Sequence, residues 1–314
     1  MRPMHVRKGH DASMDEMAAL APRLHQFVAV ARTEHMTHAA DAIGVPQSTL
    51  SRGIARLEAD LGVALFGRSG RTVRLTREGR TLLRHAERAL AELSTGIREI
   101  LGDADVLHGR VGLAFLTTLG SAAIPRLLRD FRTLYPGVQL DLLQGAHAVL
   151  LDRLRSGDAD LALTSPLPDE PGLVAVPLDE EELRLVVPAG HRLAERDGVA
   201  LAEAARETFV RFLPGFGLRG TVDAWCREAG FVPRVAFEGG DAETLRGLVG
   251  AGLGVALLPV AHHLLVPGVV ELPVTEPRTV RTIGAVWARG RPLTAPARAL
   301  LDVVCSPGRR LLGS

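Results

Sequence analysis

The chain has 314 residues, of which 46% are hydrophobic and 23% are charged. This length suggests two or three domains, and the composition excludes a disordered chain in favour of a folded globular protein. Its two cysteines, Cys226 and Cys305, are too few for a disulfide framework or a cysteine zinc site. The residues before Leu20 lack the apolar core of a signal peptide, so we expect a cytoplasmic protein.

The net charge of +1 conceals an asymmetry along the chain. Residues 1–102 hold 15 Lys and Arg against 11 Asp and Glu, whereas the remainder holds 22 against 25. Between Val45 and Arg88 there are nine basic residues and four acidic ones. A basic excess around one segment is typical of a surface that binds nucleic acid.

The N-terminal hundred residues predict helices in close succession. Residues 1–17 show no hydrophobic periodicity and predict a disordered tail, after which apolar residues from Leu20 to Ala31 recur at helical spacing. The stretch 37–61 then predicts two helices joined by a tight turn. Thr37 is placed to cap the first helix and Gly44 to end it, and the second helix begins near Pro46.

The second of these helices is amphipathic. Its apolar face is formed by Leu50, Ile54, Leu57 and Leu61, and its opposite face by Ser48, Arg52, Ala55 and Ala59, with Arg56 at the flank. A helix with small polar residues first and arginines behind them suits the DNA major groove. An ordinary amphipathic surface helix explains these residues equally well when they are taken alone.

Residues 65–76 predict a β-hairpin around Ser69-Gly70 that carries Arg68, Arg71 and Arg74. A basic hairpin after a recognition helix predicts a wing that contacts phosphates or the minor groove. The alternative is a solvated arginine-rich loop.

Thr76 can cap a long helix that runs to about Gly102. Its apolar seam has heptad spacing and consists of Leu83, Ala86, Leu90, Leu93, Ile97 and Ile100. So narrow a seam predicts a dimer built on this helix. The alternative is a helix that lays the seam against its own winged domain.

From His108 onward, strands alternate with helices, which predicts a parallel or mixed sheet covered by helices. The predicted strands are 110–116, 138–143, 161–163, 183–187, 208–212, 235–238, 255–258 and 282–288, and the predicted helices are 124–135, 147–156, 217–229, 241–250 and 294–304. The apolar segment 248–266 contains glycines and Pro259, so it predicts a buried helix and strand rather than a membrane span.

The run from His25 to Gly79 resembles the DNA-binding head of LysR-type transcriptional regulators, with VPQSTLSRGIARLE at its centre. The phrases IPRLLRDFRTLYPGVQLDL, GDADLAL, ELRLVVPAGHRLA and AGLGVALLP extend the resemblance to about Val304. It implies a multidomain fold of α+β and α/β parts: a winged helix-turn-helix (18–76), a dimerising linker helix (77–102) and an effector domain like type 2 periplasmic binding proteins. Subdomain I would hold 109–165 plus 269–305 and subdomain II 166–268, with crossings near Ser165-Pro166 and Pro267-Gly268.

The resemblance also implies a regulator that binds an interrupted inverted repeat as a dimer or tetramer and responds to a small-molecule effector. The expected DNA contacts are Thr37, Pro46, Gln47, Ser48, Thr49, Ser51, Arg52, Arg56, Arg68, Arg71 and Arg74. Gln47 suits adenine or a phosphate, and Arg52 can pair with guanine. Two departures from the family pattern are Pro46, where many members have serine, and Gly53 inside the recognition helix.

The expected effector-binding residues are Thr117, Thr118, Thr164, Ser165, Gly215, Phe216, Arg219 and Asp241. Two of the loops concerned precede predicted helices, whose free N–H groups favour an anion, and Arg219 adds a positive charge. We therefore expect a carboxylate-bearing metabolite, with neither cofactor nor metal. Alternatively, the hydroxyls are plain helix caps and Arg219 is a surface charge.

Two other functions compete with a regulator. An enzyme is disfavoured because Gly250, Gly252 and Gly254 lie between a helix and a strand, the reverse of the order that phosphate binding requires. A solute-binding protein would explain residues 109–305, but the basic N-terminal segment and the lack of a signal peptide argue against it.

Overall fold

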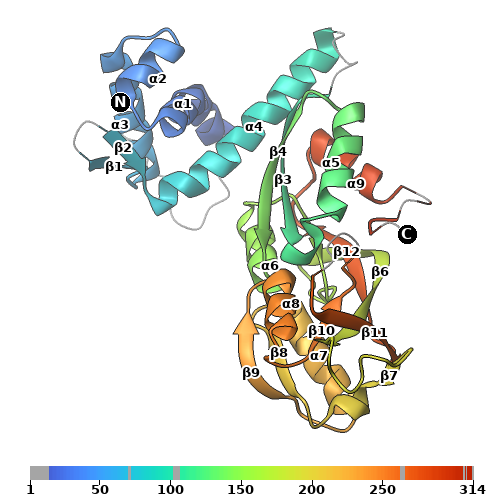
Figure 1. The fold of residues 1–314 in the computed structure, drawn as a ribbon. Helices are drawn as coiled ribbons and strands as arrows, with labels where there is room; N and C mark the ends of the chain where they lie inside the picture. Colours follow the sequence, from blue (N-terminus) through green and yellow to red (C-terminus); the bar gives the residue numbers. More distant parts are fainter. Residues whose placement is uncertain are drawn as a thin grey trace. The chain divides into compact units, whose positions relative to one another are not determined.

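The computed structural model describes residues 14–69, 72–101, 107–261, 266–306, 308 and 310–312. The chain divides into two compact units between residues 104 and 105 (Figure 1). Within the described residues, the N-terminal unit has one hydrophobic core and the C-terminal unit has two.

The N-terminal unit is a winged helix-turn-helix followed by a long helix. Its elements are α1 (Met14–Thr33), α2 (Met36–Ala42), α3 (Gln47–Leu61), β1 (Phe66–Ser69), β2 (Thr72–Leu75) and α4 (Arg77–Leu101). Phe27 of α1 and Leu50 and Leu57 of α3 are fully buried at its centre. The predicted apolar face of α3 and the antiparallel hairpin β1–β2 are therefore confirmed.

Three predictions about helix ends have different outcomes. Helix α1 begins at Met14, so residues 14–17 are helical and not part of a disordered tail, while residues 1–13 lie outside the described residues. Thr37 does not cap α2, because the helix begins one residue earlier and its N-cap is His35. Thr76 does cap α4: its hydroxyl oxygen accepts a 2.9 Å hydrogen bond from the Gly79 N–H.

The seam of α4 serves two purposes along its length. Leu83, Ala86 and Leu90 pack into the core of the N-terminal unit, as the alternative interpretation of the seam predicted. Farther along, the side chains of Leu93 and Ile97 are 64% and 57% exposed. Helix α1 packs against α4 and is joined to its first half by the 2.9 Å Arg32–Glu87 ion pair. The side chain of Ile100 lies outside the described residues.

Glu58 of α3 fixes the wing to the recognition helix. One carboxylate oxygen accepts hydrogen bonds from the backbone N–H groups of Leu65 (2.8 Å) and Phe66 (3.0 Å), at the start of β1. The wing is also held at β2, where the Val73 N–H donates to the Glu34 carbonyl oxygen at 3.1 Å. The position of the hairpin thus depends on polar contacts with α3 and with the residue that follows α1.

The first core of the C-terminal unit is a sheet with helices on both faces. Its strands β4, β3 and β5 are parallel neighbours, and β12 adds to β5 in antiparallel fashion. The elements are β3 (Gly109–Leu116), η1 (Thr117–Leu119), α5 (Ala123–Leu134), β4 (Val138–Gly145), α6 (His147–Ser156), β5 (Leu161–Thr164), β12 (Val280–Ala288) and α9 (Ala295–Val304). Helices α5 and α9 cover one face and α6 the other (Figure 1).

The second core contains the middle of the chain. Its elements are the long strand β6 (Leu173–Pro188), β7 (Val199–Ala200), η2 (Leu201–Ala204), β8 (Thr208–Phe212), α7 (Gly217–Glu228), β9 (Arg234–Gly239), α8 (Ala242–Gly250), β10 (Ala256–Pro259) and β11 (Val269–Glu276). The predicted helix and strand within 248–266 are present, and in the described part of the chain no helix has the length and apolar character needed to cross a membrane.

Extended strands connect the two cores. Leu173, at the start of β6, is buried in the first core, whereas Leu183 and Leu185 of the same strand are buried in the second. The chain returns between β11 and β12, after Leu272 and before Ile283. These crossings lie farther along the chain than the predicted ones near 165–166 and 267–268. The sequence prediction missed β7, β11 and the first half of β6. In β6, the acidic run 179–182 interrupts the apolar pattern.

The role of Glu58 predicts the effect of its removal. Glu58→Ala leaves two partly buried N–H groups without their acceptor, so the N-terminal unit should lose about 1–3 kcal/mol of unfolding free energy. Urea unfolding and amide hydrogen exchange at residues 65 and 66 measure this loss. Glu58→Gln is the matched control, because its amide oxygen can still accept both bonds. Equal losses in the two variants would contradict the assignment.

Candidate functional site

The N-terminal face of α3 is exposed. Pro46 is the N-cap residue, in an extended conformation, and the next turns present hydroxyl, amide and guanidinium groups to solvent. The exposed side chains are those of Pro46, Gln47, Ser48, Thr49, Ser51, Arg52 and Arg56. The Arg52 Nε donates to the Ser48 carbonyl oxygen at 3.2 Å, so its guanidinium lies along the predicted contact face.

Packing against α1 explains why a glycine is tolerated at position 53, inside the recognition helix. A β-carbon at this position would clash with the Oε1 atom of Gln26 on α1. Any larger residue would force the Gln26 side chain to move. The glycine therefore leaves room for the Gln26 side chain between α1 and α3.

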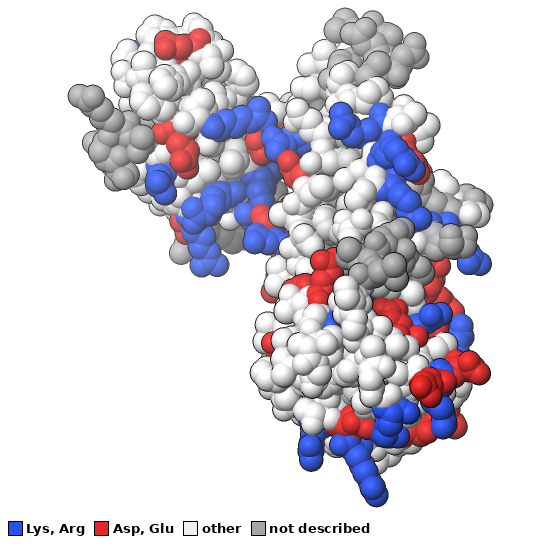
Figure 2. All heavy atoms as spheres, viewed as in Figure 1, with Lys and Arg blue, Asp and Glu red and all other residues white. Residues whose placement is uncertain are grey.

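The other predicted DNA contacts are only partly described. Thr37 on α2 and Arg74 on β2 are exposed. Arg71 and the side chain of Arg68 lie outside the described residues. On the face drawn in Figure 2, Arg side chains gather on the N-terminal unit, and acidic side chains are more frequent on the C-terminal unit.

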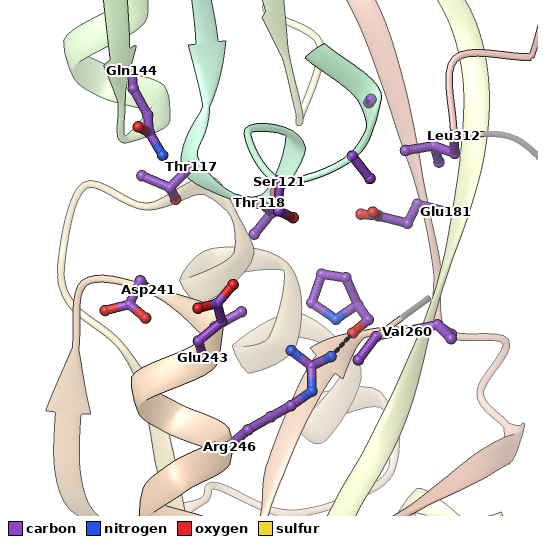
Figure 3. A pocket seen from close by; sticks show the side chains of 15 residues that line it. Thr117, Thr118, Ser121, Gln144, Glu181, Asp241, Glu243, Arg246, Val260 and Leu312 are labelled. Carbon is purple, nitrogen blue, oxygen red and sulfur yellow. Dashed lines mark hydrogen bonds between the residues drawn. The ribbon is translucent and has the colours of Figure 1, made fainter. Parts of the chain in front are cut away.

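The C-terminal unit contains a pocket of about 310 Å³ between its two cores (Figure 3). The first core contributes hydroxyl and amide groups, and α8 in the second core contributes charged groups. The lining residues are Thr117, Thr118, Ser121, Ala122, Ala123, Gln144, Glu181, Asp241, Ala242, Glu243, Arg246, Pro259, Val260, Ala261 and Leu312. Of the eight residues predicted to bind an effector, Thr117, Thr118 and Asp241 line this pocket.

Of the other predicted residues, Thr164 and Gly215 contact α6. Thr164 is buried and its hydroxyl is 2.9 Å from the His147 Nδ1 atom, and burial lowers the pKa of His147. The Ala148 N–H donates to the Gly215 carbonyl oxygen at 3.2 Å. A β-carbon on Gly217 would clash with the carbonyl oxygen of the buried Ser165. The loop before α7 therefore touches the first core directly.

Phe216 and Arg219 face residues of their own core. The Phe216 ring stacks on Phe212, with 5.3 Å between centroids. The Arg219 guanidinium donates to Glu238 at 2.6 Å and holds the pKa of that carboxyl below its ordinary value. Arg219 also lies 4.0 Å from Asp223. Because carboxylates already balance its charge and it is not a lining residue, it gives no support to a carboxylate ligand in this pocket.

The structure adds a buried polar network that the sequence prediction missed. The Arg281 guanidinium pairs with Glu181 at 2.5 Å and donates to the Thr118 hydroxyl oxygen at 2.7 Å. The side chains of Arg281 and Glu181 are only 3% and 9% exposed. A signal was present in the sequence, since the strand period of two places Arg281 on the same face as the buried Ile283 and Ala285.

A second ion pair supports α8. Arg246 donates through Nε to Glu271 at 2.8 Å and through Nη2 to the Pro259 carbonyl oxygen. Its charge is therefore already balanced within the second core. Among the described residues, no cluster of three or more His, Cys, Asp or Glu could hold a metal ion. Burial raises the pKa of the Cys226 thiol to about 12, which keeps it protonated at neutral pH.

Both units match known families. Residues 22–80 match the model of the bacterial regulatory helix-turn-helix protein, lysR family, and residues 104–306 match the LysR substrate binding domain. The HTH-type transcriptional regulator YybE of Bacillus subtilis is 38% identical over 284 residues, which are 90% of this chain and 97% of that protein.

Solved structures are also similar. A full-length OxyR variant from Pseudomonas aeruginosa is 28% identical, with a TM-score of 0.67 over 91% of this chain and 95% of that one. The effector-binding domain of QuiR, in complex with shikimate, is 26% identical, with a TM-score of 0.62 over 64% of this chain and 98% of that one. These matches confirm the resemblance seen in the sequence. The chain therefore belongs to the LysR family of transcriptional regulators, which bind DNA through the helix-turn-helix domain and respond to a small-molecule effector in the C-terminal domain.

Proposed function

We propose that this regulator reads its operator with the N-terminal face of α3, while the β1–β2 wing contacts the DNA backbone. The observation that carries this proposal is the row of exposed polar side chains from Gln47 to Arg52 at the start of α3. Residues at this end of a recognition helix reach base edges in the major groove. The exposed Arg74 on the wing provides a charge for a phosphate.

The protein acts as a homodimer, or a tetramer of two dimers, on an inverted repeat. The free part of the α4 seam supports this proposal, because Leu93 and Ile97 are apolar and exposed in the single chain. A second copy of α4 would bury them at heptad spacing. Two recognition helices would then meet two half-sites.

The effector binds in the pocket that Thr117, Thr118 and Asp241 help to line. The pocket has the size of a small-ligand site, and the similar QuiR domain was solved with shikimate. The protein works in the cytoplasm at the nucleoid and has no catalytic role of its own. An enzyme is disfavoured because the relatives are transcriptional regulators.

Footprinting of the full-length protein on the DNA flanking its own gene tests the proposed function. We expect a protected inverted repeat whose affinity falls steeply as salt increases, since phosphate contacts release counterions. Absence of protection at low salt would count against a DNA-binding regulator.

Arg52→Ala should reduce discrimination at one base position by about 1–3 kcal/mol. Arg74→Ala is the matched comparison and should weaken binding to all sequences similarly, because a phosphate contact carries no base information. Binding titrations on operators with single-base changes measure both effects. If both variants lose the same affinity on every sequence, the roles assigned to the two arginines are wrong.

Leu93→Glu should weaken dimerisation by at least about tenfold, because it places a charge in the part of the α4 seam that the proposed dimer buries. Sedimentation equilibrium of the full-length protein measures the dissociation constant. Val232→Glu introduces the same charge at a residue that is 81% exposed on the C-terminal unit and serves as the control. An unchanged dimer in the Leu93→Glu variant would exclude this part of α4 from the interface.

A further inference from the structure

We propose that the ligand held in the pocket carries an ammonium group, which the carboxylates of Glu243 and Asp241 bind from the α8 side. This inference rests on the proposed function of the pocket as the effector site. It names the chemical class of the effector, in place of the carboxylate that the sequence suggested.

Among the lining residues that the structure describes, the unbalanced charge is negative. Glu181, Asp241 and Glu243 line it, and Arg246 is the single cationic residue among the described lining residues. Glu271 already balances Arg246, and Arg281 balances Glu181. In the described part of the chain, no ion pair is found for Asp241 or Glu243. A carboxylate ligand would therefore meet two like charges, whereas an ammonium ion would neutralise one of them.

The start of α8 alone does not account for this acidic wall. Acidic residues are favourable in a first helical turn, and Asp241 is the N-cap residue, whose Oδ1 atom accepts from the Thr244 N–H at 2.7 Å. Glu181, however, belongs to β6 and faces the pocket from another side with a side chain that is 9% exposed (Figure 3). Its contacts with Arg281 use only the Oε2 atom. Glu181 thus places a buried carboxylate, paired with Arg281, on a second side of the pocket.

The opposite wall determines which other group the ligand carries. Thr118 accepts a hydrogen bond from Arg281, so its own hydroxyl proton is available to donate. Figure 3 shows Thr118 across the pocket from Glu243. A compact ligand with an ammonium group at one end and an oxygen acceptor at the other would therefore satisfy both walls. Such a ligand would also connect the two cores.

Calorimetric titration of the full-length protein at low ionic strength tests the proposal with three four-carbon probes: 4-aminobutan-1-ol, butane-1,4-diol and succinate. We expect the amino alcohol to bind about tenfold more tightly than the diol, which corresponds to about 1.4 kcal/mol. Succinate should show no saturable binding. In Glu243→Gln the preference for the amino alcohol should fall to about threefold or less.

Glu228→Gln removes the same charge from an exposed position on α7 and should leave the preference unchanged. Footprinting with each variant distinguishes a failure of the ammonium proposal from a failure of the proposed DNA-binding function. Suppose that the operator is protected, but the diol or succinate binds as tightly as the amino alcohol, or no probe binds. The ammonium proposal is then overturned, while the proposed function as a DNA-binding regulator is retained. Loss of protection by the unmodified protein would instead contradict the proposed function itself.

Discussion

The buried ion pair between Arg281 and Glu181 stands at the junction of the C-terminal unit. The two residues are direct cross-strand partners on β12 and β6, the strands on which the chain passes between its two cores. Removing one partner of a buried pair leaves an uncompensated charge, at a cost of about 3–5 kcal/mol. Because Arg281 also donates to Thr118, the same charges that join the strands fix a hydroxyl group of the pocket. The junction and the ligand site therefore share one polar network.

The DNA-binding end depends on a comparably small set of contacts. Glu58 on the inner side of α3 binds the wing through two backbone N–H groups, while the outer side of the same helix is free for DNA. Gly53 leaves room for the Gln26 side chain of α1 against α3. The exposed row of side chains at the start of α3 is thus supported by contacts on other sides of the same helix, as when a scaffold positions a binding surface.

Local patterns in the sequence predicted the elements whose burial is periodic. The apolar face of α3, the hairpin and most strands and helices of the C-terminal unit agree with the structure, because one buried face leaves a regular trace. The sites depended on contacts between distant residues and were less predictable. Arg219 was expected to face a ligand, but Glu238, 19 residues away, takes its charge. Glu181 and Arg281 are 100 residues apart, so their pairing leaves no local pattern. The division of the α4 seam likewise depends on which of its residues reach the core of the N-terminal unit.

The close approach of Gly217 to Ser165 has a mechanical consequence. On the α6 side of the sheet the two cores already touch, with no room for even a methyl group at Gly217, whereas the pocket opens near the start of α5 on the other side. Because the backbone before α7 already meets the first core there, the two cores can approach each other no further on that side. A ligand that narrows the pocket would therefore rotate one core against the other about this contact, and the displacement would grow with distance from it.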